Sequence, residues 1–225
     1  MKQEFIKRIF SSIILITLAL FFIIKGSFFF NFFILICFLI TSYEWHKMSK
    51  KKVYYFLGFF FLIFSFYTAY ALRHNFENAG IVNFLFITLI CVSTDIGGYI
   101  FGKLFKGPKL IKLSPNKTYS GMIGGYLLSI ICTNFFINYS HIFGFDGLTY
   151  NSKTFILVLL ISTVSQTGDI VISYFKRLSK IKDTGKILPG HGGLLDRIDG
   201  MIFAFPIAYL VLKIFLLFSW NFRTV

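Results

Sequence analysis

The sequence predicts an all-α fold, a polytopic bundle of about seven to eight transmembrane helices in a single integral membrane domain, residues 1–225. The 225 residues are 56% hydrophobic and 20% aromatic, and the mean hydropathy is +0.74. Apolar runs of roughly 20 residues, the length that crosses a bilayer as a helix, recur along the chain. A soluble domain of this size cannot hide so much apolar surface.

Seven apolar segments are the predicted spans, and in chain order they are 9–24, 27–42, 53–72, 80–100, 121–138, 154–174 and 201–219. Only Lys25 and Gly26 separate the first two, which predicts a tight hairpin. The basic N-terminus followed by an apolar run resembles a signal peptide, but no small-x-small cleavage site follows, so we expect it to be retained. We divide the domain into N-terminal hydrophobic spans, 1–93, and a motif-bearing part, 94–225.

Lysine and arginine are distributed asymmetrically between the predicted loops. With the N-terminus inside, 18 of the 23 basic residues fall in inside segments, chiefly 47–52, 103–117 and 176–197. Cytoplasmic loops carry such an excess, so we expect these loops to face the cytoplasm from the inner (plasma) membrane. The net charge of +14 is then mainly an orientation signal, and we expect no nucleic-acid partner.

Asp95 and Asp169 are acidic residues in apolar surroundings, within a chain that has only nine Asp and Glu. An Asp at a helix centre costs about 2.5–3.5 kcal/mol on insertion scales, and less near the span ends, where these two fall. Both adjoin glycines and hydroxyl or amide residues, which allow close helix approach and local hydrogen bonding. Either they are satisfied packing sites, or they face a polar cavity.

The stretch KILPGHGGLLDRIDG contains two carboxylates, Asp196 and Asp199, just before the last apolar run. On a helix, residues three apart share a face, with Cβ atoms about 5–6 Å apart. A helix N-cap would explain Asp196 alone. Paired carboxylates also bind Mg²⁺ and leave its other positions to phosphates, and glycines such as Gly192 and Gly193 beside His191 let backbone N–H groups approach a phosphate.

Basic residues precede this stretch and could hold the remaining phosphate oxygens. They include Lys176, Arg177 and Lys182, whereas Lys180 and Lys186 fit better as solvated charges that set the orientation. Metal-binding carboxylates beside cations are the components of a phosphoryl or nucleotidyl transfer site, which we place at the cytoplasmic surface.

The residues from Ser173 to Asp199, S-Y-F-K-R-x4-K-D-x-G-x2-L-P-x-H-G-G-x2-D-R-x-D, resemble the signature of the phosphatidate cytidylyltransferases, or CDP-diacylglycerol synthases. Two more segments resemble that family: TDIGGYIFGKLFKGPKLIKLSPNKTYSG at 94–121 and SQTGDI at 165–170. YEW, at 43–45, is similar to a further family feature. One departure is Ser120, which stands where most members carry Glu, and it argues against an essential acid at this position.

The resemblance implies a reaction of phospholipid biosynthesis, in which CTP and phosphatidic acid give CDP-diacylglycerol and diphosphate. The candidate metal ligands, for Mg²⁺ or Mn²⁺, are Asp169, Asp196, Asp199 and, as a ligand or an orienting group, Asp95. The candidate catalytic residues are Asp169, Asp196, Asp199, Lys176 and Arg177. The candidate substrate-binding residues are Lys117, Ser173, Lys182, His191, Gly192, Gly193 and Arg197.

Two alternatives remain open beside this interpretation. Buried aspartates also mark the ion paths of transporters, although no internal repeat is visible. A CTP-dependent lipid-alcohol kinase would transfer a different phosphate of CTP, whereas the D-G-x2-A-R pattern of CDP-alcohol phosphotransferases is missing from DGMIFAF at 199–205. The predicted partners are CTP, phosphatidic acid and bilayer lipid, with a second copy of the chain, a homodimer, as a further candidate.

Overall fold

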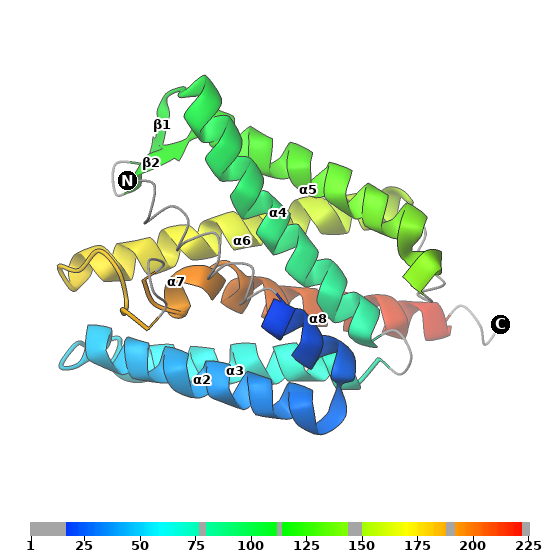
Figure 1. Cartoon of the computed structure of the whole chain (residues 1–225), viewed down its shortest axis with the longest axis horizontal. Coiled ribbons are helices and arrows are strands. Elements are labelled where there is room, and N and C mark those ends of the chain that lie inside the picture. Colours follow the sequence, from blue (N-terminus) through cyan, green and yellow to red (C-terminus); the bar gives the residue numbers. More distant parts are fainter. Residues whose placement is uncertain (1–16, 77–79, 112–113, 144–149, 188–191, 222–225) are drawn as a thin grey trace.

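Long apolar helices make up most of the computed structural model, which describes residues 17–76, 80–111, 114–143, 150–187 and 192–221. The helices are α2 (Ser27–Ser49), α3 (Tyr55–His74), α4 (Gly80–Phe105), α5 (Tyr119–Tyr139), α6 (Ser152–Leu178), α7 (Leu195–Ile198) and α8 (Met201–Asn221). Residues 17–25 are also helical. A 3₁₀ turn, η2 (Ser140–Phe143), follows α5, and two strands, β1 (Lys109–Ile111) and β2 (Ser114–Thr118), lie between α4 and α5. The helices form an elongated bundle (Figure 1).

The predicted all-α membrane bundle is confirmed. Among the residues that the structure describes, five helices are long and apolar enough to cross a membrane: Phe28–Ser49, Tyr55–His74, Gly80–Phe105, Tyr119–Ile142 and Ser152–Leu178. The predicted span 201–219 lies within α8, of which Met201–Ile214 is the apolar part whose side chains the structure describes. The predicted span 9–24 lies partly outside the described residues. The predicted span 27–42 ended too early. Its helix continues to Ser49, because the residues that follow the apolar run, such as Glu44 and Trp45, are buried against the rest of the protein.

Two apolar clusters hold the bundle together. The larger one joins α4, α6 and α8 through fully buried side chains such as Ile90, Ile161 and Ala204. The second packs Leu195 of α7 and Ile202 of α8 against α2, α3 and α6. Because Leu195 is fully buried, the short α7 is anchored beside the membrane helices and carries the residues next to Leu195 with it.

Glycines allow α4 and α5 to approach at backbone distance. A Cβ on Gly97 of α4 would collide with the carbonyl group of Gly124 on α5, and a Cβ on Gly124 would collide with Phe101. Such contacts are possible only where the side chain is missing, as in closely packed membrane helices. The α4 and α5 ends near the strands are therefore held in a fixed relation.

The strands β1 and β2 form a small antiparallel hairpin, with Lys109 opposite Thr118 and Ile111 opposite Ser114. The hairpin leads directly into α5, where the Thr118 hydroxyl group accepts a hydrogen bond from the N–H of Gly121 at 3.1 Å, as an N-cap does. The sequence did not predict these strands. Lys117 lies in β2, two residues before α5 begins, so the hairpin fixes its position.

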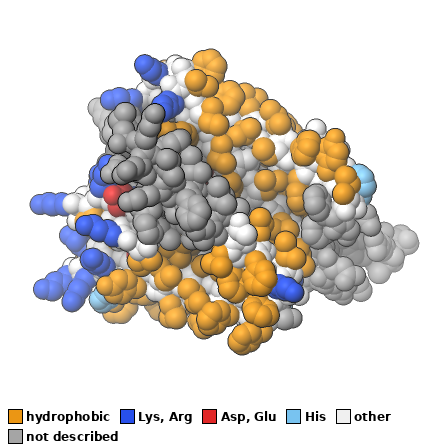
Figure 2. Space-filling model, in the orientation of Figure 1, with side chains coloured by type: hydrophobic (Ala, Val, Ile, Leu, Met, Phe, Trp, Pro, Cys, Tyr) orange, Lys and Arg blue, Asp and Glu red, His pale blue; other side chains and the backbone are white. Residues whose placement is uncertain are grey.

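The three basic segments predicted to share a side of the membrane lie at one end of the bundle. The α2–α3 turn, the hairpin and the segment after α6 are at the left of Figure 1, whereas the α3–α4 connection and the far end of α8 are at the right. Lysine and arginine gather at that left end, and hydrophobic side chains cover much of the face beside it (Figure 2). α4 runs without a break through the predicted boundary between 1–93 and 94–225, a division that stays a prediction.

Candidate active site

A cavity of about 420 Å³ opens at the basic end of the bundle, between α4, the hairpin, α5, α6 and the segment that leads into α8. Its lining includes five carboxylates, those of Asp95, Asp169, Asp183, Asp196 and Asp199. It also includes the cations Lys117, Lys176 and Arg197. The cavity thus brings together motifs that are separated by about a hundred residues along the chain.

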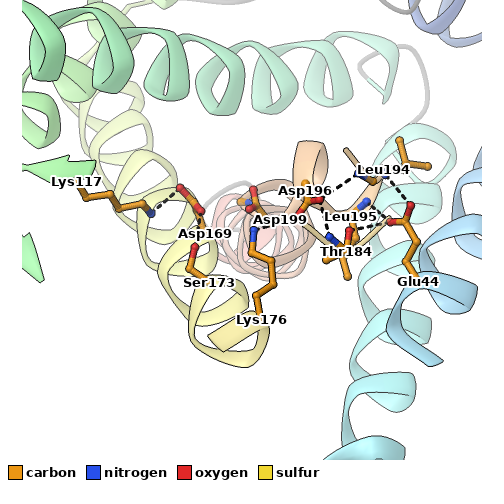
Figure 3. A network of polar contacts seen from close by, with 12 residues as sticks. Glu44, Lys117, Asp169, Ser173, Lys176, Thr184, Leu194, Leu195, Asp196 and Asp199 are labelled. Carbon is orange, nitrogen blue, oxygen red and sulfur yellow. Dashed lines mark hydrogen bonds and ion pairs between the residues drawn. The ribbon is translucent and has the colours of Figure 1, made fainter. Parts of the chain in front are cut away.

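Asp169 lies on α6 and faces the hairpin across the cavity. Its Oδ2 is 2.5 Å from the Nζ of Lys117, and the Ser173 hydroxyl group, one helical turn further along α6, donates to its Oδ1 at 3.3 Å. The same ammonium group lies 3.5 Å from the carbonyl oxygen of Gln166. Figure 3 shows Lys117 and Ser173 converging on this carboxylate. The ion pair joins the hairpin to α6 and closes one side of the cavity.

Asp196, on α7, is enclosed by donors on both oxygens. Lys176 donates to Oδ1 at 2.9 Å, and the backbone N–H groups of Thr184 and Gly193 donate to Oδ2 at 2.8 and 3.0 Å (Figure 3). Burial alone would raise the pKa of Asp196, but the hydrogen bond and charge of Lys176 and the two N–H groups hold that pKa below its usual range. Asp196 is therefore ionised at neutral pH and holds Lys176 in place.

Asp199 lies between α7 and α8 and is only 6% exposed. Its Oδ1 accepts the N–H of Gly200 at 2.9 Å. Burial, followed by the negative charge of Asp169, raises the pKa of Asp199 well above its ordinary value. Two neighbouring carboxylates repel each other, and a cation placed between them stabilises the ionised form of both. The Asp169–Asp199 pair therefore has the electrostatics of a metal-binding site.

Asp95 reaches the same cavity from α4. It follows Thr94, whose hydroxyl group donates to Ser162 on α6 at 2.9 Å and so joins the two helices beneath it. Arg197 also lines the cavity, from α7. The predicted residues on four separate elements thus face one space.

Other predicted residues lie elsewhere. Arg177 and Lys182 are exposed and outside the cavity lining, because Arg177 follows Lys176 on a different face of α6. Gly193 directs its N–H group to Asp196 and not into the cavity. Gly192 has a φ of 84°, a conformation that favours glycine. His191 lies outside the described residues.

Ser120 stays outside the cavity lining. Its hydroxyl group pairs with that of Thr118 at 3.0 Å, beside the N-cap of α5. At this position the side chain lies at the start of α5, and that no acid is essential there stays a prediction.

The sequence suggested no site role for Asp183, which lines the cavity, or for Glu44 of α2, although Glu44 lies in the YEW segment. Its carboxylate is 1% exposed and accepts hydrogen bonds from Thr184, Leu194 and Leu195, which are in the segment that carries Asp196 (Figure 3). A carboxylate at the end of an apolar span was a visible signal. Its partners could not be identified from the sequence, because they lie at least 140 residues away.

The donor set suits a hard cation that it shares with a substrate. No three His, Cys, Asp or Glu side chains within the described ranges form a complete metal site by themselves. Mg²⁺ commonly binds through one or two carboxylates and completes its shell with water and substrate phosphates, so the Asp169–Asp199 pair fits this pattern. The lining has five Asp side chains and three basic ones, so a cation that enters with a triphosphate would offset the repulsion between the phosphates and the ionised carboxylates.

Comparisons with known proteins give one consistent family. Residues 51–215 match the model of the cytidylyltransferase family. The chain is 33% identical over 215 residues to a phosphatidate cytidylyltransferase of Rickettsia typhi, a match that covers 92% of each protein. It is 39% identical over 159 residues to one of Brucella suis and 35% identical over 181 residues to one of Staphylococcus aureus. These matches cover 70% and 78% of this chain, and 56% and 66% of those relatives.

Proposed function

Because the chain belongs to the cytidylyltransferase family, we propose that it transfers the cytidylyl group of CTP to phosphatidic acid and forms CDP-diacylglycerol and diphosphate. It is a nucleotidyltransferase of phospholipid biosynthesis. One structural observation carries the assignment of the site: a single cavity at the basic end of the bundle contains Asp169, Asp199, Lys117 and Lys176 together.

The main requirement of this reaction is to neutralise negative charge on the substrates, and a general base is less important. A phosphomonoester has a second pKa near 6, so the phosphate oxygen of the lipid is largely ionised at neutral pH. That oxygen attacks the α-phosphorus of CTP and forms a new P–O bond. The bond from the α-phosphorus to the oxygen that bridges to the β-phosphorus breaks, and its electron pair leaves with diphosphate. The obstacle is the approach of one polyanion to another, followed by charge on the leaving group.

The cations of the cavity can meet this obstacle. Lys117 and Lys176 are held at fixed places by Asp169 and Asp196, so their ammonium groups are oriented before any substrate binds. Arg197 lines the same space. Preorganised charge is effective because it does not have to reorganise during the reaction. We assign these three residues to the phosphates of CTP and of the lipid.

Asp169 and Asp199 would hold a divalent cation, Mg²⁺ or Mn²⁺, with Asp95 as a further ligand or an orienting group. When bound, such an ion supplies Lewis-acid charge that offsets the negative charge of the triphosphate and of the leaving diphosphate. Asp196 has both oxygens engaged by Lys176 and by backbone N–H groups. In this arrangement Asp196 positions Lys176 and the preceding loop. As a metal ligand it would have to release one of these donors, just as Asp169 would have to release or share Lys117 or Ser173.

The position of the cavity suits a lipid substrate. It opens at an end of helices whose outer surfaces carry exposed apolar side chains, such as Phe60 and Ile131. The acyl chains of phosphatidic acid can therefore stay in the bilayer while the headgroup reaches the site. The excess of basic residues at this end supports a cytoplasmic orientation in the inner membrane, where CTP is available.

The test is an assay of the purified protein in detergent with phosphatidic acid and CTP labelled on the α-phosphate. Cytidylyl transfer predicts label in the lipid product and unlabelled diphosphate in solution. A lipid kinase would transfer the γ-phosphate and leave the label in CDP. Label that stays in CTP, or that appears in CDP, would overturn the proposal.

A further inference from the structure

Glu44 is a buried carboxylate from the N-terminal part of the chain, in the YEW segment and far along the chain from the aspartates of the site. It lies near the end of α2, is 1% exposed and makes contact with the segment between α6 and α8 (Figure 3). A carboxylate withdrawn from water is costly unless hydrogen bonds or a countercharge compensate it. The groups that donate hydrogen bonds to Glu44 therefore indicate its role.

The compensating donors all come from the segment that leads into α8. The Thr184 hydroxyl group donates to Oε2 at 3.1 Å, and the backbone N–H of Leu195 donates to the same oxygen at 2.7 Å. The N–H of Leu194 donates to Oε1 at 2.9 Å. Both oxygens of Glu44 are thus engaged. α2 is thereby attached to the start of α7 by polar contacts in a buried place.

Two glycines make room for this carboxylate. A Cβ on Gly185 would lie 2.5 Å from Oε1 of Glu44, and a Cβ on Gly193 would lie 2.7 Å from both carboxylate oxygens. Real Cβ atoms do not approach so closely, so any larger residue at either position would displace Glu44 or the segment. The glycines thus form the space into which Glu44 fits.

The same segment is held on its other side by Asp196. The N–H of Thr184 donates to Asp196 while its hydroxyl group donates to Glu44. The N–H of Gly193 donates to Asp196, and the next two N–H groups along the chain donate to Glu44. Two carboxylates therefore share the donors of one short segment, and Asp196 is held in the place where it meets Lys176.

We propose that Glu44 is a positioning residue of the active site. It fixes the backbone around Thr184 and Leu194, and through that backbone it fixes Asp196 and Asp199 relative to Lys176 and Asp169. Glu44 does not touch the substrates in this role, and it lies outside the cavity lining. The kinetic part of the inference rests on the proposed function, whereas the structural part does not.

Glutamine is the informative replacement because it keeps the size and removes one acceptor. Glu44 must accept at both oxygens, but an amide has a single oxygen, and its NH₂ group would face a backbone N–H or the Thr184 hydroxyl group. A donor opposite a donor pushes the segment away. We therefore expect Glu44→Gln to loosen the segment without creating a cavity.

The experiment compares wild type with Glu44→Gln in cytidylyl transfer at varied Mg²⁺, CTP and phosphatidic acid. We expect kcat to fall and the Mg²⁺ concentration for half-maximal rate to rise, each by about tenfold or more, because the loosened segment no longer holds Asp199 in place beside Asp169, and loss of an outer support of a metal site typically has an effect of this size. A protein that merely folds less well has fewer active molecules with unchanged half-saturation. An unchanged Mg²⁺ half-saturation would overturn the inference.

A second readout needs no activity. Lys182 and Lys186 are exposed in the segment, so trypsin can report its mobility in the purified protein without substrates. We expect faster cleavage there in Glu44→Gln than in wild type. If wild type fails to transfer label, the proposed function is wrong, yet the cleavage rates still test Glu44. Equal cleavage rates would contradict the positioning role.

Two matched variants complete the design. Thr41→Val alters another buried polar residue of α2, whose hydroxyl group donates to the carbonyl oxygens of Cys37 and Phe38 in its own helix, and we expect wild-type kinetics and cleavage. Thr184→Val removes one donor to Glu44 and leaves the N–H to Asp196, so we expect a smaller change in the same direction. If Glu44→Gln does not fold, Thr184→Val decides, and wild-type behaviour there would overturn the inference.

Discussion

Lys117 is held by the hairpin opposite Asp169, at a point where a cation can act on a phosphate. Its ammonium group is 2.5 Å from Oδ2 of Asp169 and 3.5 Å from the carbonyl oxygen of Gln166. The ammonium group belongs to the hairpin, whereas its two acceptors belong to α6. It can therefore turn from these acceptors to a phosphate of CTP when the nucleotide enters the cavity. We therefore expect Lys117 to bind the phosphates of CTP as well as to close one side of the cavity.

We expect Lys117→Met to raise the CTP concentration for half-maximal rate by roughly ten- to hundredfold. The reason is that a hydrogen bond to a charged group is worth about 1.5–3 kcal/mol. Steady-state kinetics of the purified variant measure this change. Lys109→Met is the matched control, because Lys109 is an exposed lysine of the same hairpin outside the cavity lining. Equal kinetics in the two variants would remove Lys117 from the site.

For single residues, the sequence predicts which charged side chains line the cavity better than it predicts which side chains hold them in place. Asp169 and Asp199 stand out because acidic residues are rare in the chain and because they belong to motifs. Glu44 could not be assigned, since its role depends on partners 140 to 151 residues away. The choice between Lys176 and Arg177 likewise depends on which helix face turns inward, and the sequence around them does not fix it.

The α4–α5 pair sets the geometry of the hairpin, because the hairpin connects these two helices. Gly97 contacts the backbone of α5. At the neighbouring Gly98 there is more room, because a Cβ there would lie 3.7 Å from the nearest atom, the carbonyl oxygen of Gly121. Adjacent glycines on one helix therefore differ sharply in how tightly they are packed.

Gly97→Ala should destabilise the protein by about 1–3 kcal/mol, because an added methyl group forces the helices apart. Gly98→Ala should have no such effect, since its Cβ would make an ordinary contact. Thermal unfolding in detergent measures both, and roughly 2–4 °C per kcal/mol is expected for a chain of this length. A lower melting temperature for Gly98→Ala than for Gly97→Ala would contradict the packing described here.

The helices were predictable as elements and the hairpin was not. Apolar runs of sufficient length identify spans because a bilayer sets their length. The strands have three and five residues and lie in a polar basic segment without the alternation that marks a strand. They depend on the close packing of α4 and α5, which is a property of the assembled bundle.

On the scale of the whole molecule, the distribution of charge matches the position of the cavity. The basic segments and the cavity share one end of the bundle, and exposed apolar side chains cover the helices beside them (Figures 1 and 2). The order of the loops along the chain was sufficient to predict that these segments lie together. It could not predict the depth or shape of the cavity, which depend on how the helices pack.

Single cysteines test the orientation in intact cells after Cys37, Cys91 and Cys132 are replaced by alanine. A cysteine at Lys52, in the α2–α3 turn at the cavity end, should resist a membrane-impermeant maleimide until the cells are opened. A cysteine at Lys153, at the opposite end of α6, should react from outside. The reverse pattern would place the cavity on the outer face and exclude access to cytoplasmic CTP.

The central claim is that Asp169 and Asp199 hold the divalent cation needed for transfer. The most direct test is to measure the label passed from the α-phosphate of CTP to phosphatidic acid by purified wild type, Asp169→Asn and Asp199→Asn, with Mg²⁺, with EDTA, and with Mg²⁺ restored. We predict that wild type transfers label only when the cation is present and that both variants are roughly a hundredfold slower or worse while still folded. Undiminished transfer in EDTA, or a wild-type rate in either variant, would contradict the account.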